Sequence, residues 1–213
     1  MTRSITRFNV SVGEYFPSND DFAVLVVMYL TRFEEIRIMV ARIIHLHREE
    51  VGHSSAEKLM LLRFTTISVA DIGDTVKLLE KYQIFTDSLT EQERRQFDSS
   101  AETIARVASR WSHIRDKVAG HTNKTSLRNA MSNAASETAD VTVSENPLQS
   151  EFQLVELISA AHICGKKIVR GGLKDLFDGP LMTELGEVCA AALNIHDPIL
   201  SAYQRKTGRI FQR

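Results

Sequence analysis

Apolar residues recur at steps of three and four along most of this chain, and this spacing constrains the fold more than any other feature. Between residues 20 and 49 it is carried by Phe22, Leu25, Tyr29, Phe33, Ile36, Val40 and Ile43. Such steps place side chains on one face of an α-helix, whereas a half-buried strand requires strict alternation. Val24, Val26 and Val27 would suit a strand, but the helical spacing continues through them. The pattern therefore predicts one long helix over residues 20–49.

Short polar motifs mark the expected helix starts. Three resemble capping boxes: Ser18 with Asp21 as a variant, Ser54 with Glu57, and Thr90 with Glu93. The second predicted helix continues to Tyr82, and Gly73 is expected to kink or split it. The third predicted helix ends at Gly120, because glycine is favoured directly after a helix. Its apolar stripe consists of Ile104, Val107, Trp111, Ile114 and Val118.

The second half of the chain alternates between loop signals and helix signals. Residues 122–146 are rich in Ser, Thr, Asn and Ala, which predicts a loop with a short helix near residues 127–131. Pro147 and Pro180 each stand where a helix can begin, and the second of these helices is expected to end near Asn194. The letters "DPIL" from Asp197 predict a last short helix.

The chain of 213 residues is long enough for one domain with short extensions. We expect an N-terminal arm over 1–17, one helical domain over 18–200 with a loop insertion near 122–146, and a basic C-terminal tail over 201–213. No segment alternates like a strand. The fold class predicted is all-α: a bundle of about five to seven helices, the long ones antiparallel, with no sheet.

Composition excludes several classes of protein. The net charge of −1 gives no global field that would attract nucleic acid, so a polyanion site must be a local patch. Two cysteines make no disulfide framework and favour a reducing cytoplasm. The start lacks the apolar stretch of a signal peptide, and the longest apolar run, residues 22–30, is too short to cross a membrane. The sequence thus predicts a cytoplasmic protein without a membrane partner.

Other motifs with a chemical interpretation are weak. In "HLHREEVGH", His45 and Glu49 share a helix face, but no third ligand is indicated, so we expect a solvated helix end and no metal. The stretch "CGKKIVRGGLK" lacks the order of a phosphate-binding loop. His162 and His196 are expected to be hydrogen-bonded structural histidines, and both cysteines to be small core residues. No cofactor is predicted.

Charge is concentrated in one region. From residue 103 to 130 the chain has six basic residues, Arg106, Arg110, Arg115, Lys117, Lys124 and Arg128, and one acid, Asp116. Residues 131–158 contain five acids and no Lys or Arg. A cationic patch of this kind is what a phosphate ligand requires. We therefore predict phosphate or RNA contacts from Lys117, Asn123, Lys124, Arg128 and Arg110.

Arg115 and His121 are the candidate catalytic pair within that patch. Arg115 lies at the edge of the apolar stripe, and a turn at Gly120 can return His121 toward it. His can take a proton from a ribose 2′-hydroxyl, Arg can stabilise charge on the phosphate, and Asp116 can orient either side chain. RNA cleavage needs both an acid and a base, so an enzyme of this kind requires a two-fold dimer. The dipole at a helix end also favours basic residues without any catalysis.

The segment "RDKVAGH", residues 115–121, resembles the R-x(4–6)-H signature of the HEPN superfamily, with the polar Asp116 after the arginine. The longer "IRDKVAGHTN" is similar to the corresponding stretch of abortive-infection-type HEPN proteins. This resemblance implies a dimeric helical bundle with facing motifs and metal-independent endoribonuclease activity in phage defence or a toxin–antitoxin system, where an antitoxin or regulatory protein is a further partner. It makes Arg115 and His121 the catalytic pair and Asp116 their support.

Two positions depart from the family pattern. Gly120 replaces the alanine that commonly precedes the histidine. Asn123 stands where toxins that are modified by a nucleotidyltransferase have a tyrosine, so that regulation is not predicted. Two alternatives remain beside the ribonuclease: a non-catalytic dimer that binds a nucleotide, an RNA or a protein, and a purely structural helical dimer.

Overall fold

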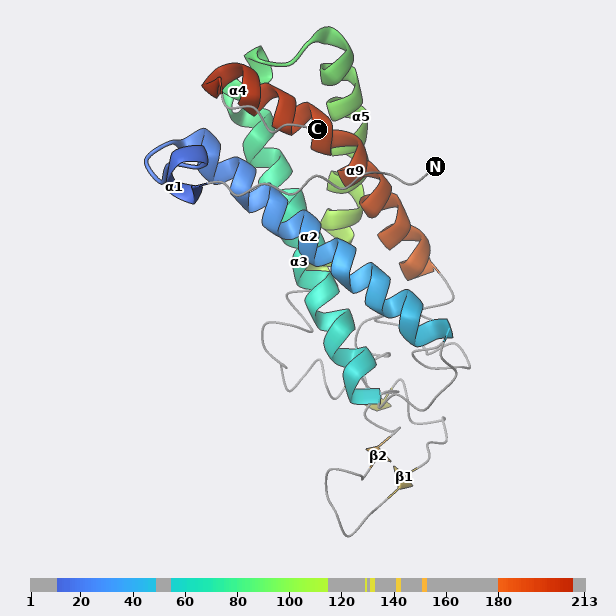
Figure 1. Ribbon diagram of the computed structural model, residues 1–213. Helices are drawn as coiled ribbons and strands as arrows, with labels where there is room; N and C mark the ends of the chain where they lie inside the picture. Colours follow the sequence, from blue (N-terminus) through green and yellow to red (C-terminus); the bar gives the residue numbers. More distant parts are fainter. Residues whose placement is uncertain are drawn as a thin grey trace, which may run out of the picture.

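The computed structural model describes residues 11–48, 55–114, 129, 131–132, 141–142, 151–152 and 180–208. Four long helices dominate this part of the chain, and two short helices accompany them (Figure 1). The helices are α1 (Val12–Tyr15), α2 (Asp21–Arg48), α3 (Ser55–Lys81), α4 (Gln83–Asp87), α5 (Glu91–Ile114) and α9 (Pro180–Thr207). The predicted all-α class is confirmed.

The four long helices form a closed ring in which α2 packs on α3, α3 on α5, α5 on α9, and α9 on α2. Side-chain contacts show that the neighbours run antiparallel. For example, Arg32 of α2 binds Asp71 of α3, while Glu35, further along α2, binds Ser68, which comes earlier in α3. The buried apolar residues of all four helices form one core. The result is the antiparallel bundle that the sequence predicts.

A small departure from the sheet-free expectation lies in the second half of the chain. The strands β1 (Val141–Thr142) and β2 (Glu151–Phe152) pair antiparallel, with Val141 opposite Phe152. The prediction of a helix from Pro147 onward is therefore wrong at residues 151–152, where the backbone pairs with a β-branched segment instead. Each strand has only two residues, so this ladder adds no layer to the bundle.

Helix α2 begins one residue later than the sequence suggests and with a different cap. The side chain of Asp20 accepts hydrogen bonds from the backbone N–H groups of Phe22 at 3.0 Å and Ala23 at 3.4 Å. Asp20 therefore takes the capping role that we assigned to Ser18 with Asp21. Either residue type can cap a helix, and only the backbone path decides which one is in place. The predicted apolar face of α2 is buried or half-buried throughout.

Gly73 neither kinks nor splits α3, which is continuous from Ser55 to Lys81. A Cβ atom placed on Gly73 would overlap the Cβ of Ala108 in α5. The glycine therefore lets the backbones of α3 and α5 approach closely, and the expectation of a break there is wrong. Its lower helix propensity, about 1 kcal/mol against alanine, is offset by the packing that it permits.

Helix α5 begins as predicted, at a complete capping box. The backbone N–H of Thr90 donates to Oε2 of Glu93 at 2.8 Å, and the N–H of Glu93 donates to Oγ1 of Thr90 at 3.3 Å. The predicted stripe is buried at Ile104, Val107 and Trp111. The predicted helix is confirmed up to Ile114, the last residue of α5 that the structure describes, and the buried stripe is confirmed up to Trp111.

Helix α9 is one continuous helix, and the two separate helices expected around Pro198 are a wrong prediction. A proline inside a helix leaves the carbonyl four residues earlier without its N–H donor. Here that carbonyl belongs to Asn194, and it accepts a hydrogen bond from Nε2 of Gln96 in α5 at 2.6 Å. A neighbouring helix thus satisfies the group that Pro198 leaves open, and the helix can continue.

The two chain segments predicted to be an arm and a tail are attached to the bundle where the structure describes them. Residues 201–207 belong to α9, and Tyr203 is fully buried. The ring of Phe16 stacks on that of Tyr203 at 5.5 Å, and the Tyr203 hydroxyl donates to the carbonyl of Tyr15 at 2.5 Å. Burial of these aromatic rings explains why residues 11–16 and 201–207 are part of the fold.

None of the helices in the described ranges has an apolar stretch long enough to cross a membrane.

Candidate functional site

The predicted catalytic residues follow directly after the described part of α5. Arg115, Asp116 and His121 lie outside the described residues, and so do four of the predicted phosphate contacts, Lys117, Asn123, Lys124 and Arg128. Their roles stay predictions. Arg110 is the predicted site residue that the structure describes, and it lies in the last turns of α5 before the motif.

Arg110 binds an acid that the sequence analysis did not identify. Its Nη1 atom forms an ion pair with Oε1 of Glu184, which lies in the first turns of α9. The Arg110 side chain remains 59% exposed, whereas that of Glu184 is only 11% exposed. The guanidinium of Arg110 thus already binds a carboxylate, and its predicted contact with phosphate stays a prediction. Counting charges along the sequence missed this acid because it is 74 residues away.

The second oxygen of Glu184 is also used. Nε1 of Trp111 donates a hydrogen bond to Oε2 of Glu184 at 2.7 Å. Trp111 is 1% exposed, so its indole N–H needs a partner inside the protein. One carboxylate thus binds two consecutive residues at the end of α5. Sequence analysis did not identify Glu184. The buried tryptophan signals that an acceptor exists, but no local pattern indicates which residue supplies it.

One turn earlier, α5 and α9 share another ion pair. Nη2 of Arg106 lies 2.6 Å from Oε2 of Glu187, and both side chains are well exposed. The hydrogen bond that Arg106 donates to Glu187 raises the pKa of Arg106. Glu187 and Glu184 together neutralise two of the six basic residues counted between residues 103 and 130. The basic patch therefore depends on the four that follow Ile114: Arg115, Lys117, Lys124 and Arg128.

Comparison of the chain with models of known protein families, with curated protein sequences and with solved structures found no match.

His196 of α9 is partly buried against the aromatic rings of α2. Its ring lies 4.9 Å from that of Phe33 and 6.1 Å from that of Tyr29. Burial lowers the pKa of His196, and Asp197 only partly opposes this, so the neutral form is favoured. No hydrogen-bond partner for its buried Nδ1 lies in the described part of the chain. There, the ring of His196 is held by aromatic packing.

Burial also shifts the pKa of two further polar side chains, Tyr29 and Cys189. The Tyr29 hydroxyl donates to the carbonyl of Ala192 at 2.6 Å, and burial is the main cause that raises its pKa, with Asp197 and Cys189 acting in the same direction. Burial also raises the pKa of the Cys189 thiol, which is half-buried against the core. A thiol of this kind is a poor nucleophile. Cys189 fits the predicted role of a small core residue, and Cys164 lies outside the described residues.

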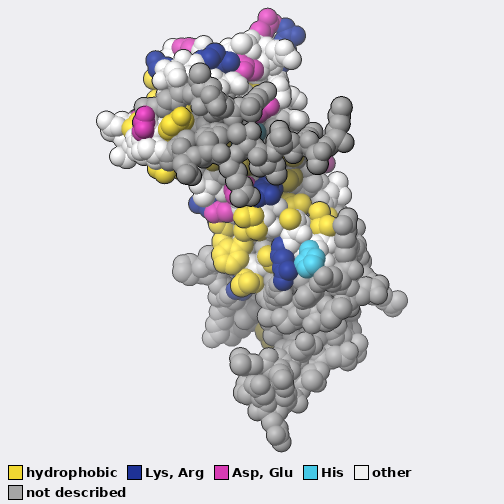
Figure 2. Space-filling model, viewed as in Figure 1, with side chains coloured by type: hydrophobic (Ala, Val, Ile, Leu, Met, Phe, Trp, Pro, Cys, Tyr) yellow, Lys and Arg dark blue, Asp and Glu magenta, His cyan; other side chains and the backbone are white. Residues whose placement is uncertain are grey.

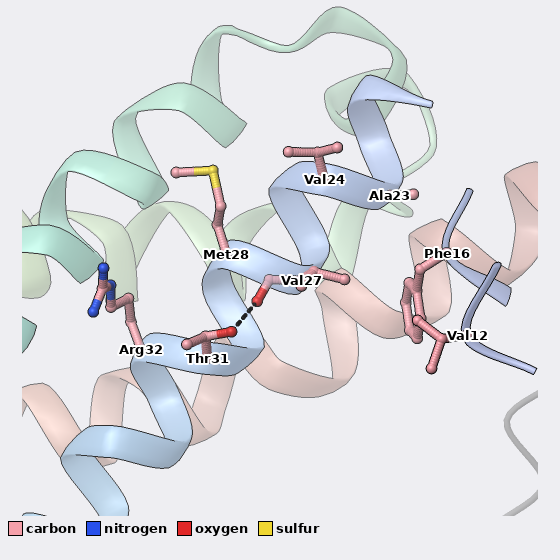
Figure 3. Close-up of a pocket in the computed structure, with 8 residues that line it drawn as sticks. All are labelled: Val12, Phe16, Ala23, Val24, Val27, Met28, Thr31 and Arg32. Carbon is pink, nitrogen blue, oxygen red and sulfur yellow. Dashed lines mark hydrogen bonds between the residues drawn. The ribbon is translucent and has the colours of Figure 1, made fainter. Parts of the chain in front are cut away.

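A shallow pocket of about 330 Å³ lies between α1 and the outer face of α2 (Figure 3). Figure 3 shows Val12 and Phe16 on one side and a row of α2 side chains on the other: Ala23, Val24, Val27, Met28, Thr31 and Arg32. The hydroxyl of Thr31 is used internally, because it donates to the carbonyl of Val27 at 2.8 Å. Arg32 is bound to Glu35 and Asp71. The pocket thus offers apolar contact but no chemical group for catalysis.

The outer surface of the bundle has exposed apolar side chains beyond this pocket. Figure 2 shows hydrophobic side chains gathered over α2 and α3. Exposed apolar residues of these two helices are Ile38 and Ile44 of α2 and Met60 and Phe64 of α3, each more than a third exposed. Within the described ranges, no three His, Cys, Asp or Glu side chains converge in a way that could hold a metal ion.

Proposed function

We propose that the chain is a metal-independent endoribonuclease of HEPN type, acting as a cytoplasmic homodimer in phage defence or a toxin–antitoxin system. The observation that carries the proposal is the segment "IRDKVAGHTN", which resembles the HEPN signature and begins at the end of α5. The all-α bundle of long helices is the type of fold in which this signature occurs. The proposal concerns chemistry at Arg115 and His121.

In the proposed reaction, His121 accepts the proton of a ribose 2′-hydroxyl, whose oxygen then attacks the adjacent phosphorus. Arg115 stabilises the charge that develops on the phosphate oxygens, and the histidine of the second copy donates a proton to the leaving 5′-oxygen. Asp116 orients the pair. General acid–base catalysis of this kind contributes about 10²–10⁴-fold to a rate. The four basic residues from Arg115 to Arg128 would bind the RNA backbone.

The test is to incubate the protein with structured and unstructured RNA in the presence of EDTA. We expect cleavage by the wild type and at least about a 100-fold loss in His121→Ala and Arg115→Ala. The matched control is His45→Ala, which removes an exposed imidazole from α2. Cleavage that persists in His121→Ala contradicts the proposal.

The alternative is a non-catalytic dimer that binds RNA, a nucleotide or a protein through the same basic residues. Arg106 and Arg110 already bind Glu187 and Glu184, so in this case too the basic residues after Ile114 would supply most of the phosphate contacts. In that case the wild type binds RNA with a steep salt dependence that Arg115→Ala weakens, and no RNA is cut.

A further inference from the structure

The outer face of α2, which α3 and α9 leave exposed, is apolar toward both ends and charged in the middle. Glu34 and Arg37 lie in the middle, where they are 50% and 57% exposed and bind each other. The large hydrophobic side chains of this face are 39–55% exposed and form one group on each side of that pair: Val24, Val27 and Met28, then Ile38 and Ile44. An exposed apolar stripe of this kind is typical of a contact with another protein.

The pattern along this face is self-complementary about one point. Val27 lies seven residues before Glu34, and Ile44 lies seven residues after Arg37. The midpoint of both pairs, Val27 with Ile44 and Glu34 with Arg37, therefore falls between residues 35 and 36. A second α2 that runs antiparallel about a two-fold axis at this point has its Arg37 at the height of Glu34 and its Ile44 at the height of Val27.

The two charges of this face determine which partner fits. A partner helix with charges of one sign would meet one attractive and one repulsive side chain at the middle of α2. A second copy presents the opposite charge at both positions, so Glu34 and Arg37 can form two ion pairs between the copies in place of the pair within each helix. The apolar groups on either side are removed from water in the same contact and supply the affinity.

The pocket between α1 and α2 gives the apolar part of this contact a defined shape. Val27 and Met28 line it from α2, and Val12 and Phe16 line it from α1 (Figure 3). Its volume of about 330 Å³ lies within the range that holds small molecules, so one aliphatic side chain fits. In the antiparallel arrangement that side chain is Ile44 of the second copy, because it lies at the height of Val27.

We propose that the outer face of α2 binds a second copy of this chain in an antiparallel two-fold contact, with Glu34 opposite Arg37. The contact does not depend on the proposed cleavage of RNA. Both α2 and α5 are antiparallel to α9, so they run in the same direction. An antiparallel pair of α2 helices thus places the two ends of α5 on opposite sides of the two-fold axis. The dimer required by the ribonuclease uses another face, and the two contacts together form a tetramer.

The test reverses each charge separately and then mixes the variants. Glu34→Arg places an arginine opposite Arg37 of the second copy, and Arg37→Glu places a glutamate opposite Glu34, so each variant repels itself. In an equimolar mixture, two arginines of one chain meet two glutamates of the other. The matched control is Arg95→Glu, which makes the same charge change in an exposed ion pair of α5. Sedimentation velocity over a range of concentrations measures the mass of each sample.

We expect each of the two α2 variants to have half the mass of the wild type, with association weakened by at least about 100-fold. The mixture should recover the mass of the wild type, and so should the double variant with both charges reversed. Arg95→Glu should associate like the wild type. Recovery on mixing also excludes misfolding as the cause of the lost association, because mixing does not refold a chain.

A wild type with the mass of a monomer at every concentration overturns the inference. So does an unchanged mass in Glu34→Arg or Arg37→Glu, or a mixture that stays at half the mass of the wild type while circular dichroism shows both chains to be helical. RNA cleavage is not measured in this experiment. If the wild type cuts no RNA, the proposed function fails, and the masses still decide whether α2 joins two copies.

Discussion

The two ends of the α5–α9 helix pair are joined by different chemistry. At the beginning of α5, Arg205 of α9 binds Glu93 at 2.6 Å and donates to the carbonyl of Ser88 at 2.7 Å. The Arg205 side chain is 42% exposed, so water can replace these bonds. The aromatic rings of Phe85 and Phe97 pack close by in an edge-to-face contact, with their centroids 4.9 Å apart. Apolar packing in the core therefore holds α5 and α9 together at this end, and the ion pair contributes little to stability.

At the other end of α5 the polar contact is part of the core. Trp111 is the largest buried side chain of the described residues, and its only polar atom is bonded to Glu184. The same side chain, Trp111, therefore supplies both the core packing and the hydrogen bond at this end. At the beginning of α5, different residues supply the core packing and the ion pair. The comparison teaches that similar acid–arginine pairs between the same helices can have very different consequences, according to whether the acid also accepts a hydrogen bond from a buried side chain of the core.

Removal of Trp111 should give the largest effect. Trp111→Ala creates a cavity and leaves Glu184 without one of its two donors, so we expect a loss of about 3–5 kcal/mol in the free energy of unfolding. Urea unfolding followed by far-UV circular dichroism measures it, since the variant lacks the only tryptophan. Phe85→Ala tests core packing at the other end of α5. A much smaller loss in Trp111→Ala than in Phe85→Ala would contradict this double role of Trp111.

Substitution of Gly73 tests how tightly α3 packs against the end of α5 that binds Glu184. Gly73→Val places side-chain atoms where the Cβ of Ala108 lies, and overpacking of this kind costs about 1–3 kcal/mol. The matched control is Gly186→Ala in α9, where an added Cβ would meet nothing within 4 Å. That control should stabilise the protein by about 0.5–1 kcal/mol, because alanine is the better helix former. Thermal unfolding of both variants checks the opposite signs.

Much of the bundle could be predicted from the sequence because helix periodicity and capping are local. The capping box of Thr90 and Glu93 and the buried stripe through Ile104, Val107 and Trp111 were both recognisable within a few residues. The errors have a shared cause. Continuation of α9 through Pro198 depends on Gln96, a residue of another helix. The close approach of α3 and α5 that Gly73 permits depends on the position of Ala108. Partners that are distant in the chain leave no local signal.

The same limit applies to the candidate site. Sequence analysis identified a basic cluster and assigned Arg110 to it, since the neighbouring residues of the chain contain few acids. The acid that binds Arg110 comes from α9, and its pairing with Trp111 requires the two helices to be antiparallel and in register. A buried tryptophan predicts that some acceptor exists. Only the packing of α9 on α5 identifies it as Glu184.

The smallest effect is expected at the beginning of α5, where Glu93→Gln keeps the capping box but removes the ion pair with Arg205. Burial raises the pKa of Glu93, but hydrogen bonds from Arg205 and Thr90 outweigh it, so the folded-state pKa lies below its ordinary value of 4.5. A group with a lowered folded pKa contributes stability above its unfolded pKa and loses it as the pH falls through the folded value. We therefore expect Glu93→Gln to cost only about 0.2–1 kcal/mol at pH 7. The difference from the wild type should vanish on acidification below the ordinary pKa of glutamate, in urea titrations repeated from pH 7 to pH 3. A constant difference over this range would show that the lost stability comes from the cap and not from the charge, and the two ends of α5 would then differ less than their burial indicates.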